Sequence, residues 1–145
     1  MLDLTSYDRA IARLEEALQY AHSDLAKRGP RLATHLRASV IQAFEFTYEL
    51  AYKMLRRYLQ ATEYSPEVID TASFNDVIRL GFEPELLRAQ LAEWKGFRTD
   101  RAATSHTYDE LKAEQVLQNV PAFLLDAHHL RNAIREWQEA DAHAS

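Results

Sequence analysis

The segment from about Leu32 to Gln60 constrains the fold most, because its apolar side chains recur at helical spacing along several adjacent faces. It predicts one helix with an axis of about 43 Å. The apolar positions form three faces, which are Val40, Phe44, Thr47, Ala51, Met54 and Tyr58, then Ile41, Tyr48, Leu55 and Leu59, and finally Phe46 and Leu50. Such a helix is covered on more than one side. It is therefore either the centre of a bundle or part of a subunit interface.

Few residues favour turns. The chain of 145 residues has only three Gly and four Pro, which favours a few long elements over many short strands. Its length suffices for a real core, and no repeat or long linker divides it. We expect a single helical-bundle domain over residues 1–140 and a frayed C-terminal tail over residues 141–145.

Start and stop signals predict further helices around the long one. The first runs from about Tyr7 to Lys27, with Thr5 and Asp8 as a capping box, and ends at Gly29 and Pro30. Shorter helices follow, and another begins near Pro84. The short helices have their own signals, which are an N-cap at Ser65, an N-cap at Ser73 and a stop at Gly81.

The last helix is predicted from about Tyr108 to Ala140, with Pro121 causing a kink or a short break. Its apolar residues alternate at spacings of four and three, namely Val116, Val120, Phe123, Ala127, Leu130, Ile134 and Trp137. Four substantial helices with short connections predict an all-α fold, an antiparallel bundle of four to five helices.

Composition also restricts function. The net charge of −5 argues against broad capture of nucleic acid, so stable DNA binding is not expected, while a local basic site could still act on RNA. The absence of Cys excludes disulfides and thiolate metal sites and fits a reducing cytosol. Neither a signal peptide nor a membrane span is indicated. We expect a cytoplasmic protein.

The segment from Arg101 to Tyr108 carries the candidate chemistry, because Arg, His and Tyr fall within eight residues where the helical pattern breaks down. The guanidinium of Arg101 can grip a phosphate or stabilise developing negative charge. His106 can move protons near neutral pH. The Tyr108 hydroxyl can donate, accept or be modified.

A helix break is predicted inside this segment. On an unbroken helix, Arg101 and His106 would lie about 140° apart. Thr107 and Glu110 form a second capping box, so one helix stops near Thr104 and another starts after Thr107. His106 then lies in the joint, beside a helix N-terminus that favours anions, where it can converge with Arg101.

The helix before the joint has an apolar face of Leu87, Leu91 and Trp94, which continues to Arg98 and Arg101. Since arginines are rarely buried without a partner, we expect Arg101 to emerge where that face leaves the bundle.

Arg101 and His106 suit RNA cleavage without a metal or another cofactor. The imidazole would take a proton from a ribose 2′-hydroxyl or give one to the leaving 5′-oxygen, and the guanidinium would stabilise the transition state. A symmetric dimer could bring two such sites together. The alternative is purely structural, because a His beside Asp109 and Glu110 often serves only as a local hydrogen-bond partner.

Other candidates favour structural roles. His128 and His129 are adjacent on a helix, point about 100° apart and cannot chelate one metal together. Glu45, Glu49 and Lys53 form a charge ladder first and an acid/base pair only second.

A basic cluster of Lys53, Arg56 and Arg57 could meet a phosphate backbone, although a solvated face is the favoured interpretation. The aromatic residues nearby are interpreted as core or interface residues, not as base-stacking platforms. They are Tyr48, Tyr52, Tyr58 and Trp94.

Two motifs in this order resemble a known family. Residues 44–53 read Phe-Glu-Phe-Thr-Tyr-Glu-Leu-Ala-Tyr-Lys, and residues 101–108 contain Arg, four residues, His, one residue and Tyr. Both are similar to the motifs of the HEPN-type nucleotidyltransferase substrate-binding proteins, and the helical plan agrees over essentially the full chain. The resemblance implies a four- or five-helix bundle that forms a homodimer.

The resemblance also implies a partner, a small nucleotidyltransferase usually encoded nearby. In the related HepT/MntA-type toxin–antitoxin pairs, the HEPN protein is a metal-independent RNase toxin with a catalytic Arg and His, here Arg101 and His106. The nucleotidyltransferase neutralises it by adding AMP to the motif Tyr, here Tyr108. Ser105 and Thr107 would support the site.

The chain departs from the family pattern at Ala102, where members commonly carry a polar residue, often Asn. Ala102 removes one possible hydrogen bond to the substrate or to the catalytic groups. Two alternatives to the RNase therefore stay open, which are a non-catalytic subunit of a two-component nucleotidyltransferase that binds a substrate or nucleotide, and a structural helical dimer.

Overall fold

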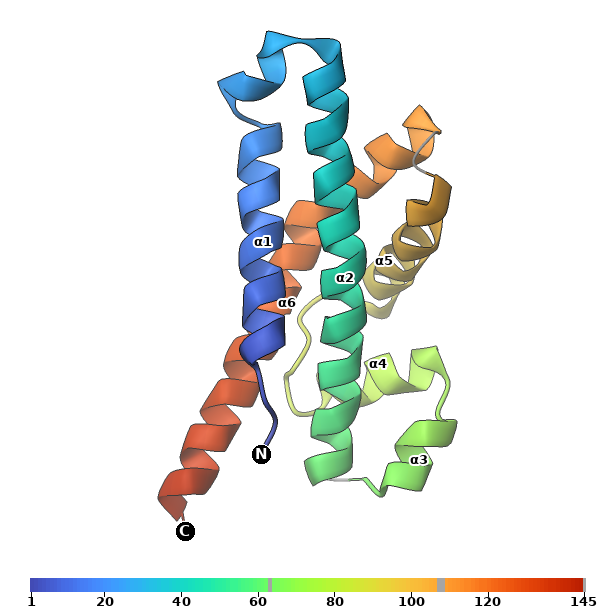
Figure 1. The fold of residues 1–145 in the computed structure, drawn as a ribbon. Helices are drawn as coiled ribbons and strands as arrows, with labels where there is room; N and C mark the ends of the chain where they lie inside the picture. The colour runs from blue at the N-terminus through green and yellow to red at the C-terminus, as the bar shows by residue number, and fades with distance from the viewer. Residues whose placement is uncertain (63, 107–108, 145) are drawn as a thin grey trace.

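The computed structural model describes residues 1–62, 64–106 and 109–144. These residues form helices and connections without a strand (Figure 1), which confirms the predicted all-α bundle. In chain order the elements are α1 (Thr5–Ala21), the 3₁₀-helix η1 (Asp24–Arg28), α2 (Pro30–Thr62), α3 (Pro66–Thr71), α4 (Phe74–Phe82), α5 (Leu91–Ala103), the 3₁₀-helix η2 (Thr104–His106) and α6 (Glu110–Ala144).

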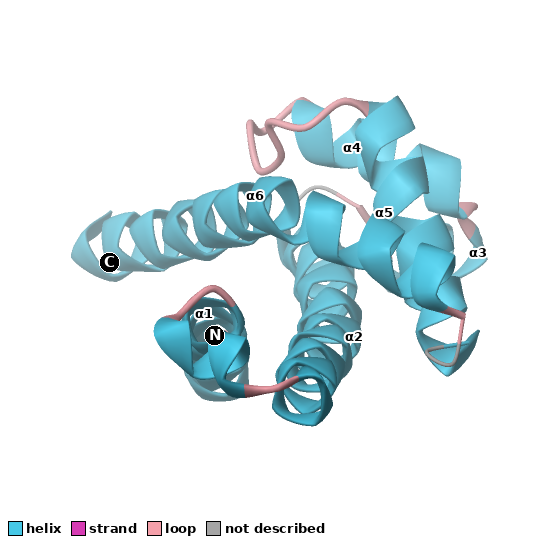
Figure 2. Cartoon of the chain, turned by 90° about the horizontal axis from the view of Figure 1, so that it is seen from above, coloured by secondary structure: helices cyan, strands magenta, loops and turns pink. Residues whose placement is uncertain are grey.

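Helix α2 is the central element, as its apolar pattern predicts. It packs against α1 on one side and against α4 and α5 on the other, and α6 crosses behind it (Figures 1 and 2). Ten of the twelve positions on its predicted apolar faces are buried, from Val40 to Leu59. The third predicted face is wrong, because Phe46 is exposed and Leu50 is only half-buried. The covering of α2 on several sides therefore comes from helices of the same chain.

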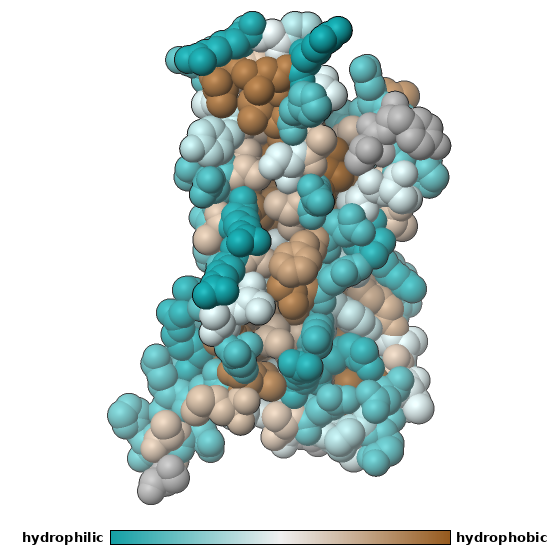
Figure 3. Space-filling model, in the orientation of Figure 1, coloured by the Kyte–Doolittle hydropathy of each residue, from teal (hydrophilic) through white to brown (hydrophobic). Residues whose placement is uncertain are grey.

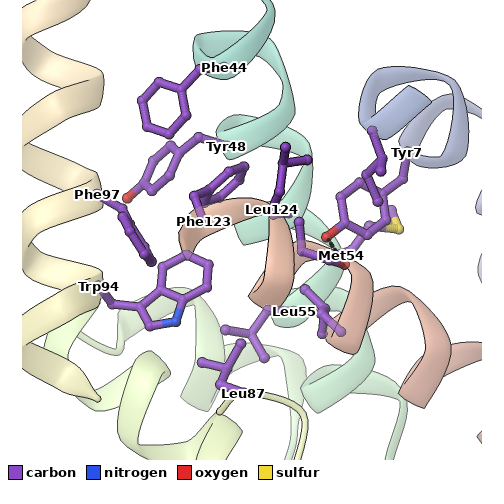
Figure 4. Packing of buried hydrophobic residues seen from close by; sticks show 14 of the residues in the cluster. Tyr7, Phe44, Tyr48, Met54, Leu55, Leu87, Trp94, Phe97, Phe123 and Leu124 are labelled. Atoms are coloured by element: carbon purple, nitrogen blue, oxygen red, sulfur yellow. Dashed lines mark hydrogen bonds between the residues drawn. The ribbon is translucent and has the colours of Figure 1, made fainter. Parts of the chain in front are cut away.

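Aromatic side chains from three helices fill the core beside α2. Phe123 of α6 meets Phe44 of α2 edge to face, with ring centroids 5.1 Å apart, and Phe97 of α5 in the same way at 5.5 Å. Trp94 is fully buried next to them (Figure 4). Such packing fixes the rotation of α5 about its axis, and hence the direction in which its outer residues point.

A buried carboxylate joins α6 to the start of α5. Asp126, which is 2% exposed, accepts hydrogen bonds from the backbone N–H groups of Arg88 (2.8 Å) and Ala89 (3.3 Å) and from the indole Nε1 of Trp94 (2.6 Å). Three donors therefore compensate the burial of one carboxylate.

The prediction of a helix near Pro84 is wrong, since α5 begins only at Leu91. Two features of the preceding segment explain the late start. Glu85 has a left-handed backbone (φ 59°), and the backbone N–H groups that Asp126 binds are not available for helical hydrogen bonds. A tertiary contact overrides the local signal here.

The first helix also differs from its prediction, because α1 ends at Ala21 instead of Lys27 and η1 follows it. Thr5 and Asp8 do not form a capping box, since Leu4 occupies the N-cap position. The Asp8 carboxylate instead pairs with Arg131 of α6, with 2.7 Å between Oδ1 and Nε.

The predicted N-caps at Ser65 and Ser73 are confirmed, and each serine oxygen accepts a backbone hydrogen bond at the start of α3 or α4. Gly81, however, lies inside α4, which closes one residue later at Phe82.

Helix α6 shows no break at Pro121 and extends to Ala144, through the segment expected to fray. Pro121 itself is exposed, while Val120 and Phe123 beside it are buried. Core packing on both sides of the proline offsets its missing hydrogen bond. None of the helices in the described part of the chain has the length and apolarity of a membrane span.

Replacing Asp126 with Ala should strongly destabilise the bundle. The change leaves the Trp94 indole and two backbone N–H groups buried without acceptors, at a cost of about 3 kcal/mol or more. Urea unfolding followed by tryptophan fluorescence measures the loss. Glu136→Ala, at an exposed position of the same helix, is the control. Equal midpoints for the two variants would contradict the role of Asp126.

Candidate functional site

The candidate site lies where α5 ends. The prediction that this helix stops near Thr104 is confirmed, because η2 replaces it from Thr104 to His106. The buried Thr104 hydroxyl donates to the carbonyl of Arg101 (2.6 Å), and the Ser105 hydroxyl donates to the carbonyl of Ala102 (3.2 Å). Both hydroxyls thus satisfy the last carbonyls of α5 and hold the turn after Arg101.

Arg101 reaches across to α2 and pairs with two carboxylates. Its Nε donates to Glu49 Oε1 at 3.0 Å, and its Nη2 donates to the same oxygen. Glu45 Oε1 lies 3.4 Å from Nη2. The hydrogen bond that Arg101 donates to Glu49 raises the pKa of the guanidinium further, so the side chain stays cationic. About a third of it (36%) remains exposed.

The charge-ladder interpretation of Glu45 and Glu49 is therefore incomplete. Within the described residues, both carboxylates pair with Arg101, and neither pairs with Lys53. The sequence holds a partial signal, which is two acids one turn apart in the first motif and one cation in the second. Nothing in the local pattern shows that α2 and α5 bring them together.

The predicted apolar face leading to Arg101 also needs correction. Leu87 precedes α5, and the buried face of the helix runs through Trp94, Phe97 and Asp100. Arg101 lies at the edge of this face and not along it. It still emerges at the rim of the bundle, where its carboxylate partners meet it.

His106 is the last residue of η2 and is half-buried. Its carbonyl accepts a hydrogen bond from the backbone N–H of Asp109 (2.9 Å). The Asp109 carboxylate then accepts from the N–H groups of Leu111 (3.0 Å) and Lys112 (3.3 Å), so Asp109 is the N-cap of α6. The predicted joint is real, with its cap two residues later than expected.

Two predicted site residues, Thr107 and Tyr108, lie outside the described residues. Of the other predicted site residues, the structure places Arg101, Ser105 and His106 on one short segment that packs against α2 and α6.

A buried acid anchors the site from below. Asp100 precedes Arg101, is 2% exposed and accepts a hydrogen bond from Asn119 Nδ2 of α6 (2.6 Å). Burial raises the pKa of Asp100, and the hydrogen bond from Asn119 opposes this. The pair joins α5 to α6 directly behind the arginine.

A groove of about 600 Å³ between α1 and α2 borders the site. Glu45 and Glu49 line its edge, and Tyr20 and Phe46, each about half exposed, line it further along. Figure 3 shows apolar surface between hydrophilic side chains on the α1–α2 face. Glu45 and Glu49 therefore belong both to the candidate site around Arg101 and to the groove between α1 and α2.

The two adjacent histidines of α6 serve as structural contacts. His128 Nε2 lies 2.9 Å from Glu15 Oε1 of α1, and His129 Nε2 lies 2.7 Å from the carbonyl of Glu85. The rings meet different elements, as their adjacent positions predict.

Comparison with known proteins agrees with this architecture. Residues 2–136 match the family described as nucleotidyltransferase substrate binding protein like. The chain belongs to this family. The match covers every element that builds the site, including the residues of both motifs.

Individual relatives align over nearly the whole chain. The protein named "Probable ribonuclease HepT" from Haemophilus influenzae is 32% identical over 97% of both chains. A solved Haemophilus influenzae structure, described as the fold of a substrate binding domain of a nucleotidyltransferase, has a TM-score of 0.85 and 31% identity over 92% of this chain and 99% of that one. A crystal structure from Thermus thermophilus has a TM-score of 0.68 and 29% identity over 89% of this chain and 98% of that one.

The raised pKa of Asp100 gives a pH prediction. The Asp100 carboxyl keeps its proton to a higher pH in the folded protein than in the unfolded chain. Protonation of Asp100 therefore stabilises the fold fully below the ordinary aspartate pKa of 3.8, and this stabilisation is lost as the pH rises through the folded pKa. Asp100→Asn removes the titration and keeps an acceptor for Asn119. The free energy of unfolding of Asp100→Asn, measured by urea titration at several pH values, should therefore increase relative to that of wild type as the pH rises from 3.8 toward neutrality. Asp141→Asn is the exposed control, and a pH-independent difference for Asp100→Asn would refute the assignment.

Proposed function

We propose that this protein is a metal-independent endoribonuclease toxin that cleaves RNA with Arg101 and His106. Its partner is a small nucleotidyltransferase, encoded nearby, that silences it by adding AMP to Tyr108. The observation that carries the proposal is the position of Arg101, a cation held at the rim of the bundle by two carboxylates, five residues before the histidine that ends η2. The likeness to a protein named as a ribonuclease supports it.

The carboxylate contacts orient the guanidinium without using all of its donors. Glu49 and Glu45 contact the side of the guanidinium that carries Nε and Nη2. Nη1 donates no hydrogen bond to any of the described residues, so its two N–H groups remain for a phosphate oxygen. When negative charge develops on the phosphate, a cation that is already fixed in place needs less reorganisation free energy to stabilise it than a mobile cation needs.

The proposed reaction is an internal transfer at phosphorus. The ribose 2′-oxygen attacks the adjacent phosphorus while the His106 imidazole accepts its proton. The bond from phosphorus to the 5′-oxygen breaks, and that oxygen takes a proton from an imidazolium, which restores the charge balance. Arg101 stabilises the extra negative charge on the non-bridging oxygens. In a homodimer, a second copy could supply the second imidazole.

Silencing by the nucleotidyltransferase follows from electrostatics. The phenol oxygen of Tyr108 would attack the α-phosphorus of ATP and release pyrophosphate. Tyr108 follows His106 by two residues, so the added phosphate and nucleoside would stand beside the proposed catalytic groups. Their negative charge and bulk oppose the entry of an RNA phosphate. Such a pair would act in the cytoplasm, where RNA and ATP are present.

A second candidate function is a binding subunit that has no catalysis of its own. Ala102 favours it, because this exposed position after Arg101 carries only a methyl group. The description of the solved Haemophilus influenzae structure as a substrate-binding domain is consistent with it. This candidate predicts a stable complex with the nucleotidyltransferase and intact RNA.

RNA cleavage by the purified protein tests the first candidate. In EDTA, wild type should cut single-stranded RNA, and His106→Ala and Arg101→Ala should each be slower by roughly 100-fold or more, since each removes a group that acts in the transition state. Gel analysis of labelled RNA measures the rates. His143→Ala, near the C-terminal end of α6, is the matched control. Intact RNA with wild type would favour the binding subunit.

Mass spectrometry tests the modification. After incubation with the nucleotidyltransferase and ATP, the peptide containing Tyr108 should carry one AMP, and RNase activity should fall in proportion to occupancy. Tyr108→Phe should stay unmodified and remain active in the presence of the partner, while Tyr20→Phe should behave as wild type. Loss of activity without an adenylate on Tyr108 would rule out this form of control.

A further inference from the structure

A second arginine lies one turn before the candidate catalytic arginine. Arg98 precedes Arg101 by three residues on α5 and is exposed. Its guanidinium carbon lies 4.7 Å from the centre of the Phe74 ring of α4. Within the described part of the chain, no carboxylate forms an ion pair with Arg98, whereas two bind Arg101. Arg98 therefore offers a positive charge that these residues do not neutralise.

Aromatic rings and a further arginine continue the surface from Arg98. The Phe74 ring lies 5.5 Å from the Tyr52 ring of α2, and the guanidinium carbon of Arg56 lies 5.9 Å from the centre of Tyr52. All of these except Arg98 are half-buried. Arg56 also pairs with Asp70 (3.2 Å), but an exposed pair of this kind is weak and exchangeable. We call these four residues, Tyr52, Arg56, Phe74 and Arg98, the arginine–aromatic strip.

The strip is continuous with the candidate site. On α2, Tyr52 follows Glu49 by one turn, and on α5 Arg98 stands one turn from Arg101. Arg98 opposes the effect of burial on the pKa values of both Tyr48 and Tyr52, so it lies near the faces of α2 that lead to the site. Figure 1 shows α4 and α5 on the same side of α2. The strip therefore runs from Arg101 across α2 and α5 to α4.

The chemistry of the strip fits single-stranded nucleic acid. Proteins that hold single strands combine cations that follow the phosphates with aromatic faces on which bases stack. Guanidinium groups placed over rings, as Arg98 is over Phe74, serve both purposes, because they stay charged while they contact the aromatic face. In a chain with a net charge of −5, a cation that forms no ion pair with any described carboxylate gives a local attraction for phosphate and leaves most of the surface repulsive.

We infer that the arginine–aromatic strip binds single-stranded RNA and leads it to Arg101. This rests on the proposed function and adds a substrate-binding surface to it. The strip gives the RNA a path along α2 and α5, so the scissile phosphate is presented beside Arg101 by contacts several nucleotides away.

Binding is measured on the His106→Ala background, so that RNA is held without being cut. The probe is a fluorescently labelled single-stranded RNA of about 12 nucleotides, within the range that one such surface covers, and anisotropy is recorded at several salt concentrations. Adding Arg98→Ala should weaken binding about fivefold or more and reduce the salt slope by about 0.7, the value for one lost phosphate contact. Adding Phe74→Leu should weaken binding with an unchanged slope. Arg31→Ala, which removes an equal charge near the start of α2, should change neither.

Each result decides the inference. If the His106→Ala protein binds RNA tightly and the added Arg98→Ala and Arg31→Ala changes give equal affinities, RNA binding by the strip is refuted. The proposed cleavage by Arg101 and His106 is not affected by that result. Failure of the His106→Ala protein to bind RNA, together with wild-type protein that leaves RNA intact, would overturn both. If Arg98→Ala keeps its RNA affinity but loses the complex with the nucleotidyltransferase, the strip is a protein interface and the inference is wrong. Circular dichroism of all variants checks that the bundle is folded.

Discussion

The burial of α2 on several sides is the constraint on which the rest of the structure depends. A helix that is apolar nearly all round cannot be covered by one neighbour, so α1 packs on one side and α4, α5 and α6 on the others. The part of α2 that stays outside the core includes Glu45 and Glu49. Because aromatic packing against Phe123 fixes α5 beside α2, the arginine at the edge of α5 has these carboxylates as its nearest partners.

The pairing of Arg101 with two glutamates has opposing consequences for the proposed chemistry. The carboxylates hold the guanidinium in one orientation and keep it charged, which favours catalysis by preorganisation. They also give the cluster a net formal charge of −1, since two acids face one base, and this opposes the approach of a phosphate. The second cation, Arg98, which forms no ion pair within the described residues, offsets that repulsion one turn away. In the proposed mechanism, substrate binding and charge stabilisation are the roles of two different arginines of one helix.

The joint between α5 and α6 links the chemistry to the proposed control. Thr104 and Ser105 bind the last carbonyls of α5, and Asp109 caps α6, so the chain reverses within a few residues. Any group added at Tyr108 would enter this short joint, beside His106. In the proposed control, a nucleotidyltransferase that modifies one hydroxyl there would block the site without unfolding the bundle.

The sequence by itself determined the all-α class, the central helix, the caps at Ser65 and Ser73, the stop near Thr104 and the two motifs, because helix period and capping depend on residues only a few positions apart. It did not determine which charges meet. Arg101 pairs with a carboxylate 52 residues away, Arg131 with one 123 residues away, and Trp94 with one 32 residues away. Tertiary contacts also set the start of α5, because Asp126 accepts hydrogen bonds from the backbone N–H groups of Arg88 and Ala89. Only the tertiary structure could decide them, since the free energy of a buried or partly buried charge depends on its neighbours in space and not on its neighbours in the chain.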